Sequence, residues 1–294
     1  MPFEQNKPLP VSSSRPPCFP ADQEALFREV LELMEREQVP VAVSGAFALH
    51  EHTGIWRDTK DLDLFLPAQE VARALQLLDH DGFETEVLDP IWLAKARRGD
   101  YFVDLITGMS NAVIRVDYMW IRRASRSEIF GISARVLAPE ELIASKVFVT
   151  RRERFDGADI CHVIYGTRGE FDWQHLMSLM GEHWQMLLWC LVLYQYIYPG
   201  YCHYVPASIW EELMSRFSME LKHPNKAIDF RGSLIDENMF AIDVLEWGKR
   251  NAMEEYRLRA DTIQSNGLSQ PPNINDRKLD EGLDQERQDR DEAA

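Results

Sequence analysis

Three aspartates are spaced so that together they could hold a metal ion. Asp61 and Asp63 lie two residues apart in the run T-K-D-L-D-L-F-L, and Asp104 follows roughly forty residues later in Y-F-V-D-L-I. Side chains two apart on a β-strand project from one face, so the pair would point together, and Asp104 would join it from a neighbouring strand. Like charges this close resist joint ionisation, and a hard divalent cation removes the conflict. The pattern predicts a Mg²⁺ site that handles a phosphorylated ligand.

A serine-glycine turn precedes the aspartate pair. The run V-A-V-S-G-A-F-A-L-H leads from an expected strand through Ser44 and Gly45 into an expected helix. Glycine lets the backbone approach a phosphate closely, and the free N–H groups at a helix start favour an anion. Arg57 precedes Asp61 by four residues and could clamp a phosphate, although an ordinary loop arginine explains the position nearly as well.

Further charged residues follow in the second half of the chain. Lys146 lies on the apolar side of its expected helix, where a lysine either extends outward or points into a site. We favour contact with a triphosphate. Asp156 and Asp159 have the spacing of N-cap and N3 positions for the next helix. We prefer capping for Asp156 and hold capping and a site role equal for Asp159.

The elements that must position these residues alternate in the first half of the chain. Hydrophobic periodicity predicts helices at 21–38, 45–52 and 68–79, and strands at 41–44, 61–66, 83–88, 101–106, 116–121 and 132–137. The second half predicts helices at 139–150, 156–166, 172–180, 183–198 and 206–217. We therefore expect an α+β protein, with a mixed sheet flanked by helices at 21–138 and a helical lobe at 139–256. A flexible arm (1–20) and a disordered charged tail (257–294) would flank them.

Composition narrows the classes of function. The chain has 294 residues, of which 45% are hydrophobic, and a formal net charge of -16, which argues against a general nucleic-acid binder. Local basic clusters remain at 95–98, 122–126 and 151–154. The four cysteines lack paired spacing, and the N-terminus lacks the features of a signal peptide. The longest apolar run, 184–198, is too short to span a bilayer. We expect a reduced, cytoplasmic protein without membrane association, in which that run is a buried helix.

Four motifs resemble those of the nucleotidyltransferase superfamily, which has a polymerase-β-like fold. They are V-S-G-A-F-A-L (43–49), R-D-T-K-D-L-D-L (57–64), F-V-D-L-I (102–106) and A-P-E-E-L-I-A-S-K (138–146). The resemblance covers roughly residues 25–165 and lies nearest an uncharacterised bacterial branch close to the abortive-infection toxins. The order Ser44 then Gly45 departs from the family, which usually has glycine followed by glycine or serine.

The resemblance implies transfer of a nucleoside monophosphate from a nucleoside triphosphate, such as ATP, to an acceptor hydroxyl, with release of pyrophosphate. Two Mg²⁺ ions, or Mn²⁺ in their place, would be held by Asp61, Asp63 and Asp104, which are also the expected catalytic residues. The expected nucleotide-binding residues are Ser44, Gly45, Arg57, Lys146 and Asp159.

The acceptor and the base preference stay open. A tRNA, a small molecule or a protein could receive the nucleotide, and a toxin-type enzyme acting on tRNA would have an antitoxin partner. A second class is a non-catalytic nucleotide-binding module, supported only by the Ser44-Gly45 order. A phosphatase of the D-x-D-x-T type is disfavoured because Phe65 stands where threonine would be expected.

Overall fold

A seven-stranded sheet forms the centre of the fold. The computed structural model describes residues 19–267 except residue 58. The strands lie in the order β3-β4-β5-β2-β1-β7-β6. β2 pairs with β5, and β1 with β7, in parallel, and the other neighbours are antiparallel, so the expected mixed sheet is present. Their bounds are β1 Ala42–Val43, β2 Asp61–Phe65, β3 Glu84–Asp89, β4 Leu93–Arg98, β5 Tyr101–Ile106, β6 Ser125–Ile129 and β7 Ile132–Val136.

The two faces of the sheet differ in what they carry. Leu62, Leu64 and Leu105 are fully buried and alternate along β2 and β5 with the aspartates, so they point to the opposite face. Helix α1 (Ala21–Arg36) packs on β5 and β7, and α3 (Val71–His80) packs on β3 and β4, preceded by the short turn η1 (Ala68–Glu70). The aspartate face is left for α2 (Gly45–Thr53) and the helices that follow.

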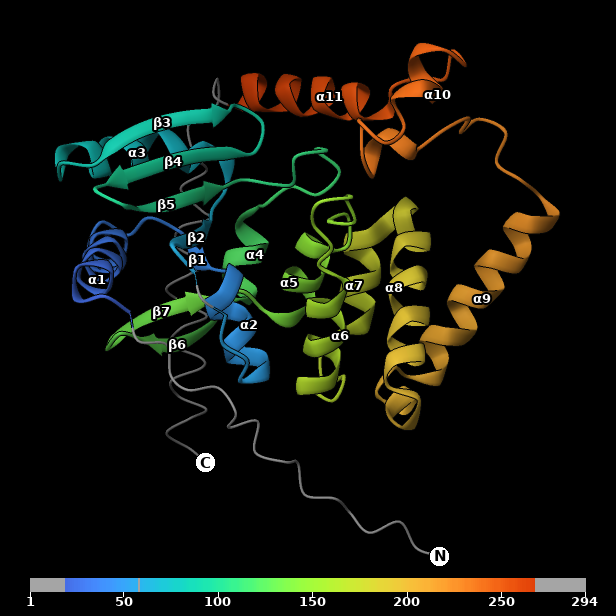
Figure 1. Cartoon of the computed structure of the whole chain (residues 1–294), viewed down its shortest axis with the longest axis horizontal. Helices are drawn as coiled ribbons and strands as arrows, with labels where there is room; N and C mark the ends of the chain where they lie inside the picture. The colour runs from blue at the N-terminus through green and yellow to red at the C-terminus, as the bar shows by residue number, and fades with distance from the viewer. Residues whose placement is uncertain (1–18, 58, 268–294) are drawn as a thin grey trace, which may run out of the picture.

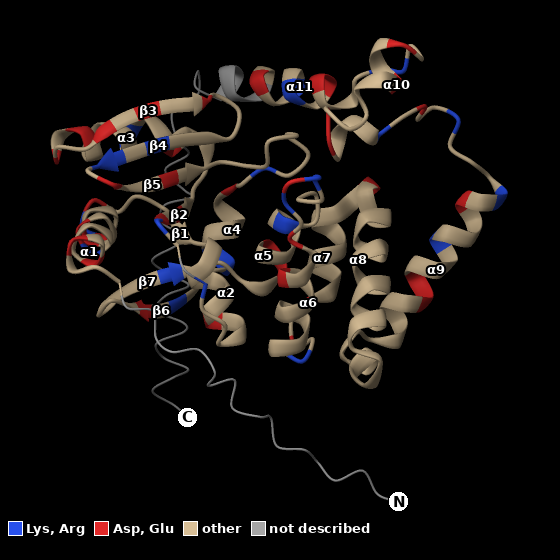
Figure 2. Ribbon diagram, viewed as in Figure 1, with Lys and Arg blue, Asp and Glu red and all other residues tan. Residues whose placement is uncertain are grey.

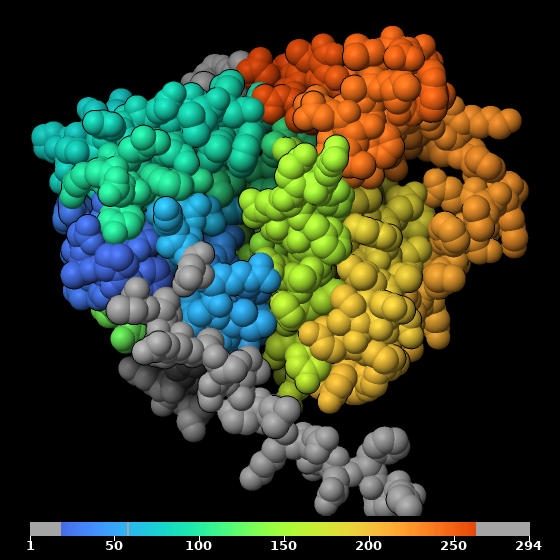
Figure 3. Space-filling view, in the orientation of Figure 1, coloured from blue at the N-terminus to red at the C-terminus, as the bar shows by residue number. Residues whose placement is uncertain are grey.

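The second half of the chain is helical, as expected. Figure 1 shows these helices beside the sheet, and in Figure 3 the orange-red segment that contains α11, the last helix among the described residues, lies along one side of the molecule. Buried side chains from the sheet and from the helices join in one hydrophobic cluster. The helical elements are α5 Pro139–Lys146, α6 Gly157–Gly166, α7 Trp173–Met180, η2 Gly181–His183, α8 Trp184–Ile197, η3 Pro199–Tyr204, α9 Ala207–Lys222, η4 Gly232–Leu234, α10 Ala241–Leu245 and α11 Ala252–Gly267.

One apolar stretch, Trp173–Ile197, is long enough to cross a membrane by length and composition. It contains α7, η2 and α8, and half of its most apolar window is buried inside the protein. Leu187, Leu191 and Tyr194 of α8 are fully buried, as the sequence predicted for a core helix.

The structure corrects three expectations about secondary structure. The strand expected at 116–121 is wrong, because α4 (Tyr118–Arg123) lies there and the Asp117 side chain accepts N-cap hydrogen bonds from Met119 and Trp120. β4 and β6 were not expected. β6 is an exposed edge strand with little apolar pattern, and β4 buries only Ala94 and Ala96 on its apolar side.

The third correction concerns the C-terminal boundary. α11 continues to Gly267, so the described chain is ordered past residue 257, where the disordered tail was expected to begin. The Arg257 guanidinium donates hydrogen bonds of 3.0 and 2.9 Å to the two Asp89 carboxylate oxygens, and Ala260 is buried. These contacts fasten α11 to the end of β3, a constraint that the charged local sequence does not reveal.

Candidate active site

Strand register brings the three aspartates together. In the parallel pair β2 and β5, Asp63 lies opposite Asp104 and Asp61 lies opposite Phe102, so all three carboxyl groups project from one face. One ligand oxygen from each aspartate can be chosen so that all lie within 4.8 Å of one another. The expected convergence of Asp61, Asp63 and Asp104, hereafter the aspartate triad, is confirmed.

The electrostatics of the triad favour a bound cation. Burial, together with the negative charges of Asp61 and Asp104, raises the pKa of Asp63 from 3.8 to about 7, against the weaker opposing effect of Lys146 and Arg154. Burial also raises the pKa of Asp104, although Lys95 opposes this. Carboxylate oxygens are the ligands that Mg²⁺ and Mn²⁺ prefer, so the donor set fits either ion.

Gly45 allows the backbone to approach the triad closely. Its φ is +58°, and a β-carbon at this position would overlap Oδ2 of Asp63. The adjacent Ser44 N–H donates a 2.9 Å hydrogen bond to the Asp63 carbonyl, which ties the start of α2 to β2. The Ser44 side chain is buried but does not cap α2. The N-terminus of α2 therefore lies directly beside Asp63, where its N–H groups favour an anion.

A network of ion pairs lies next to the triad. The buried Lys146 ammonium is 2.8 Å from Asp156 Oδ2 and 2.8 Å from Asp159 Oδ2. Arg57 also pairs with Asp159, and Arg154 donates two 3.0 Å hydrogen bonds to Asp156. Lys146 is therefore already bound to two carboxylates, and Arg57 is linked to it through Asp159.

Asp156 does not act as the expected cap. It occupies the N-cap position of α6, but its side chain makes no capping hydrogen bond and instead binds Lys146 and Arg154. Although burial acts to raise its pKa, these hydrogen bonds and cations outweigh burial and lower it. The nearby cations pull the carboxylate away from the helix N–H groups.

The sequence matches the family described as "Nucleotidyl transferase of unknown function (DUF2204)" over residues 23–176, which is more than half of the chain. The chain belongs to this nucleotidyl transferase family. The matched region includes all three aspartates as well as Lys146 and Asp159. No curated protein matches the sequence.

Several solved structures are similar at low sequence identity. The antibiotic-resistance factor ANT(2'')-Ia is 17% identical, with a TM-score of 0.37, and the match covers 62% of this chain and 96% of that one. The lincosamide antibiotic adenylyltransferase LnuA is 16% identical, with a TM-score of 0.35 and coverage of 48% and 95%. An antigenic nucleotidyltransferase-like protein from Paracoccidioides brasiliensis is 18% identical, with a TM-score of 0.42 and coverage of 62% and 93%.

Two residues of this nucleotidyl transferase contact the triad although the motifs did not assign them to the site. Thr59 donates hydrogen bonds from Oγ1 to the Asp61 carbonyl (3.1 Å) and to Asp61 Oδ1. Lys95 Nζ lies 3.1 Å from Asp104 Oδ1. The contact between Lys95 and Asp104 could have been predicted from the two-residue turn Gly99-Asp100. A turn of this length between β4 and β5 places residue 95 opposite residue 104.

The basic clusters divide between structural and exposed roles. Arg98 pairs with Glu29, and Arg123 pairs with Glu140 and Glu141, so these two stabilise the fold. Figure 2 shows basic residues on the loop between α5 and α6, which carries Arg151, Arg152 and Arg154. This loop adjoins the triad through Arg154, whose positive charge acts on Asp63.

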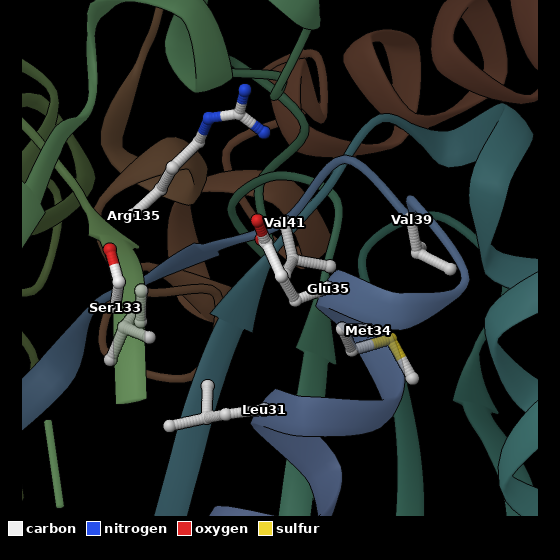
Figure 4. A pocket seen from close by; sticks show the side chains of 9 residues that line it. Leu31, Met34, Glu35, Val39, Val41, Ser133 and Arg135 are labelled. Carbon is white, nitrogen blue, oxygen red and sulfur yellow. The ribbon is translucent and has the colours of Figure 1, made fainter. Parts of the chain in front are cut away.

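Two cavities lie away from the triad. Figure 4 shows a small one beneath α1, of about 10 Å³, lined among others by Leu31, Val41 and Ser133; it has room for about one water molecule. A larger cavity of about 260 Å³ lies between α3 and strands β3 and β4, on the face opposite the aspartates. Neither lining includes an aspartate of the triad, which lies on the other face.

Proposed function

We propose that this protein transfers a nucleoside monophosphate from a nucleoside triphosphate to an acceptor hydroxyl and releases pyrophosphate. The observation that carries this function is the convergence of Asp61, Asp63 and Asp104 beside the close backbone approach at Gly45. A carboxylate cluster handles a polyanion only with a cation, and a helix start supplies the N–H groups that a phosphate needs.

Asp61 and Asp63 of the aspartate triad would hold Mg²⁺, with Mn²⁺ as a substitute, and Asp104 would complete the cluster on the acceptor side. When bound, the ion neutralises the triphosphate and the charge that develops on the leaving group. The acceptor oxygen forms a bond to the α-phosphorus while the bond from that phosphorus to the bridging oxygen breaks, and pyrophosphate leaves. Asp104, whose Oδ1 faces Lys95, would take the hydroxyl proton on its other carboxylate oxygen.

The remaining residues would bind the triphosphate in two ways. Gly45 offers a backbone N–H group at the start of α2, and Ser44, whose own N–H is bonded to the Asp63 carbonyl, would contribute its side-chain hydroxyl. Arg57, whose side chain is 47% exposed, can reach a phosphate while it keeps its ion pair to Asp159. Lys146 would have to leave two carboxylates to touch a phosphate, so we assign it to positioning Asp159 and, through Asp159, Arg57.

The acceptor could be a tRNA, a small molecule or a protein, in the cytoplasm. The exposed loop with Arg151, Arg152 and Arg154 supports an anionic acceptor such as tRNA, as in a toxin-type enzyme restrained by an antitoxin. A small acceptor needs only the space beside Asp104. Labelled nucleotides incubated with total tRNA, and separately with aminoglycosides and lincosamides, would distinguish these classes by where the label appears.

Calorimetry tests the proposed function directly. Each of the four nucleoside triphosphates is titrated into wild type and into the double variant Asp61→Asn/Asp63→Asn, with Mg²⁺ and with EDTA. We expect binding that requires Mg²⁺ and is lost in the double variant. Asp79→Asn, an exposed change on α3, is the matched control and should bind like wild type. Metal-independent binding that survives the double change would refute nucleotidyl transfer at this site and favour a different binding module.

A further inference from the structure

A lysine is held against one end of the aspartate triad. Lys95 lies on β4 directly opposite Asp104 in the antiparallel register with β5. Its ammonium is 3.1 Å from Asp104 Oδ1 and 3.6 Å from the centre of the Phe102 ring, and only 19% of the side chain is exposed. An ion pair, a cation–π contact and a fixed strand register together hold this charge in place.

Other cations near the triad are committed elsewhere. Lys146 is bound between Asp156 and Asp159, and Arg154 binds Asp156. They influence Asp63 only through space. In the part of the chain that the structure describes, Lys95 is therefore the one cationic side chain in direct contact with a carboxylate of the triad.

The position of Lys95 conflicts with a second metal ion. In a two-ion site the third carboxylate helps to hold the ion on the acceptor side. Here Oδ1 of that carboxylate, Asp104, already faces an ammonium, and a divalent ion bound to the same oxygen would repel it at close range. The Lys95 ammonium offsets one of the three carboxylate charges, so it lowers the attraction of the triad for a second divalent ion.

We infer that Lys95 takes the place of the second metal ion, so that the site binds one divalent cation. Asp61 and Asp63 would hold that cation beside the triphosphate, and the Lys95 ammonium would supply the positive charge at Asp104, where the acceptor hydroxyl approaches. The ammonium is a compact point charge with three donors, so it can also orient the acceptor oxygen. This one-ion site rests on the proposed nucleotidyl transfer and changes the two-ion expectation drawn from the sequence.

Metal stoichiometry tests the role of Lys95 without any turnover. Mn²⁺ is titrated calorimetrically into the full chain in the presence of each α,β-methylene nucleoside triphosphate, and the spin coupling of bound Mn²⁺ is read by electron paramagnetic resonance. Wild type should bind one Mn²⁺ per chain with an uncoupled signal. Lys95→Met, which keeps an apolar side chain of similar length, should bind two with the coupled signal of neighbouring ions.

Two further variants sharpen the comparison. Lys95→Arg keeps the positive charge and should bind one ion, and Lys222→Met, an exposed change on α9, removes the same charge far from the triad and should also bind one. Thermal melts establish that each variant is folded. If Lys95→Met does not fold, Lys95→Gln, which also removes the charge but keeps a polar side chain, takes its place and should bind two ions.

Each outcome has a distinct meaning. Two ions in wild type would overturn the role of Lys95 and leave nucleotidyl transfer standing, because the lysine would then simply move aside. One ion in both wild type and Lys95→Met would also overturn it, since the lysine would not be what excludes the second ion. No ion in any variant would instead remove the proposed function, and the one-ion site with it.

Discussion

The half-buried carboxyl group of Asp63 should make the metal-free protein less stable at higher pH. Its pKa is raised from 3.8 to about 7 by burial and by the neighbouring aspartates. Between these two values the folded chain keeps a proton that the unfolded chain has lost, so stability falls as the pH rises from about 4 to about 7 and then levels off. Replacing Asp63 with asparagine, which has nearly the same shape and no charge, removes this penalty.

The size of the effect follows from the pKa. A rise from 3.8 to about 7, at about 1.4 kcal/mol per pH unit, gives at most about 4 kcal/mol at pH 8. Between pH 5 and pH 8 the stability advantage of Asp63→Asn over wild type should therefore grow by roughly 2 to 3 kcal/mol. Burial also raises the pKa of Asp104, which adds a pH dependence of the same sign to both proteins.

Chemical denaturation in EDTA at several pH values between 5 and 8 measures this difference. Asp79→Asn serves as the control, because it removes an exposed carboxylate from α3 and should show no such trend. Added Mg²⁺ should stabilise wild type at pH 8 but not Asp63→Asn, since metal ligation requires the ionised carboxylate. A difference that stays flat across this range, or a wild type more stable than the variant at pH 8, would refute the assigned burial and charge of Asp63.

Three further substitutions test the supports of the site. Gly45→Ala would place a β-carbon against Asp63 at a φ of +58°. We expect this change to lower the stability by about 1 to 2 kcal/mol and the rate of nucleotide transfer roughly 100-fold. Gly200→Ala is the control, because nothing obstructs a β-carbon there, and it should change neither quantity. Lys146→Met would leave two buried carboxylates without their ammonium and should cost roughly 3 to 5 kcal/mol by denaturant unfolding; an unchanged midpoint would contradict the ion network. Leu64→Ala, at a fully buried strand position, should cost about 2 to 5 kcal/mol without changing the metal stoichiometry, measured by the same unfolding and by Mn²⁺ titration.

Local patterns predicted most of the elements for identifiable reasons. Strand 61–66 alternates apolar residues with the two aspartates, strand 101–106 is a short apolar run around Asp104, and β2 and β5 lie there. The helix of α4 was missed because Val116 and the aromatic residues after it favour a strand, whereas the Asp117 cap outweighs that preference. β4 was missed because its apolar side is made of alanines, which carry little strand signal.

The sequence by itself determined the chemistry of the site: two aspartates on one strand face, a third on a second strand, and a glycine before them. Those follow from a period of two residues and from residue type, which are local properties. Only the tertiary structure decided which cations meet which carboxylates. It bound Lys146 to Asp156 and Asp159, and it brought Lys95 to Asp104. Such ion pairs depend on strand register and on how helices pack against a sheet. Their energies depend on neighbouring groups that are distant in the sequence, so local patterns do not predict them.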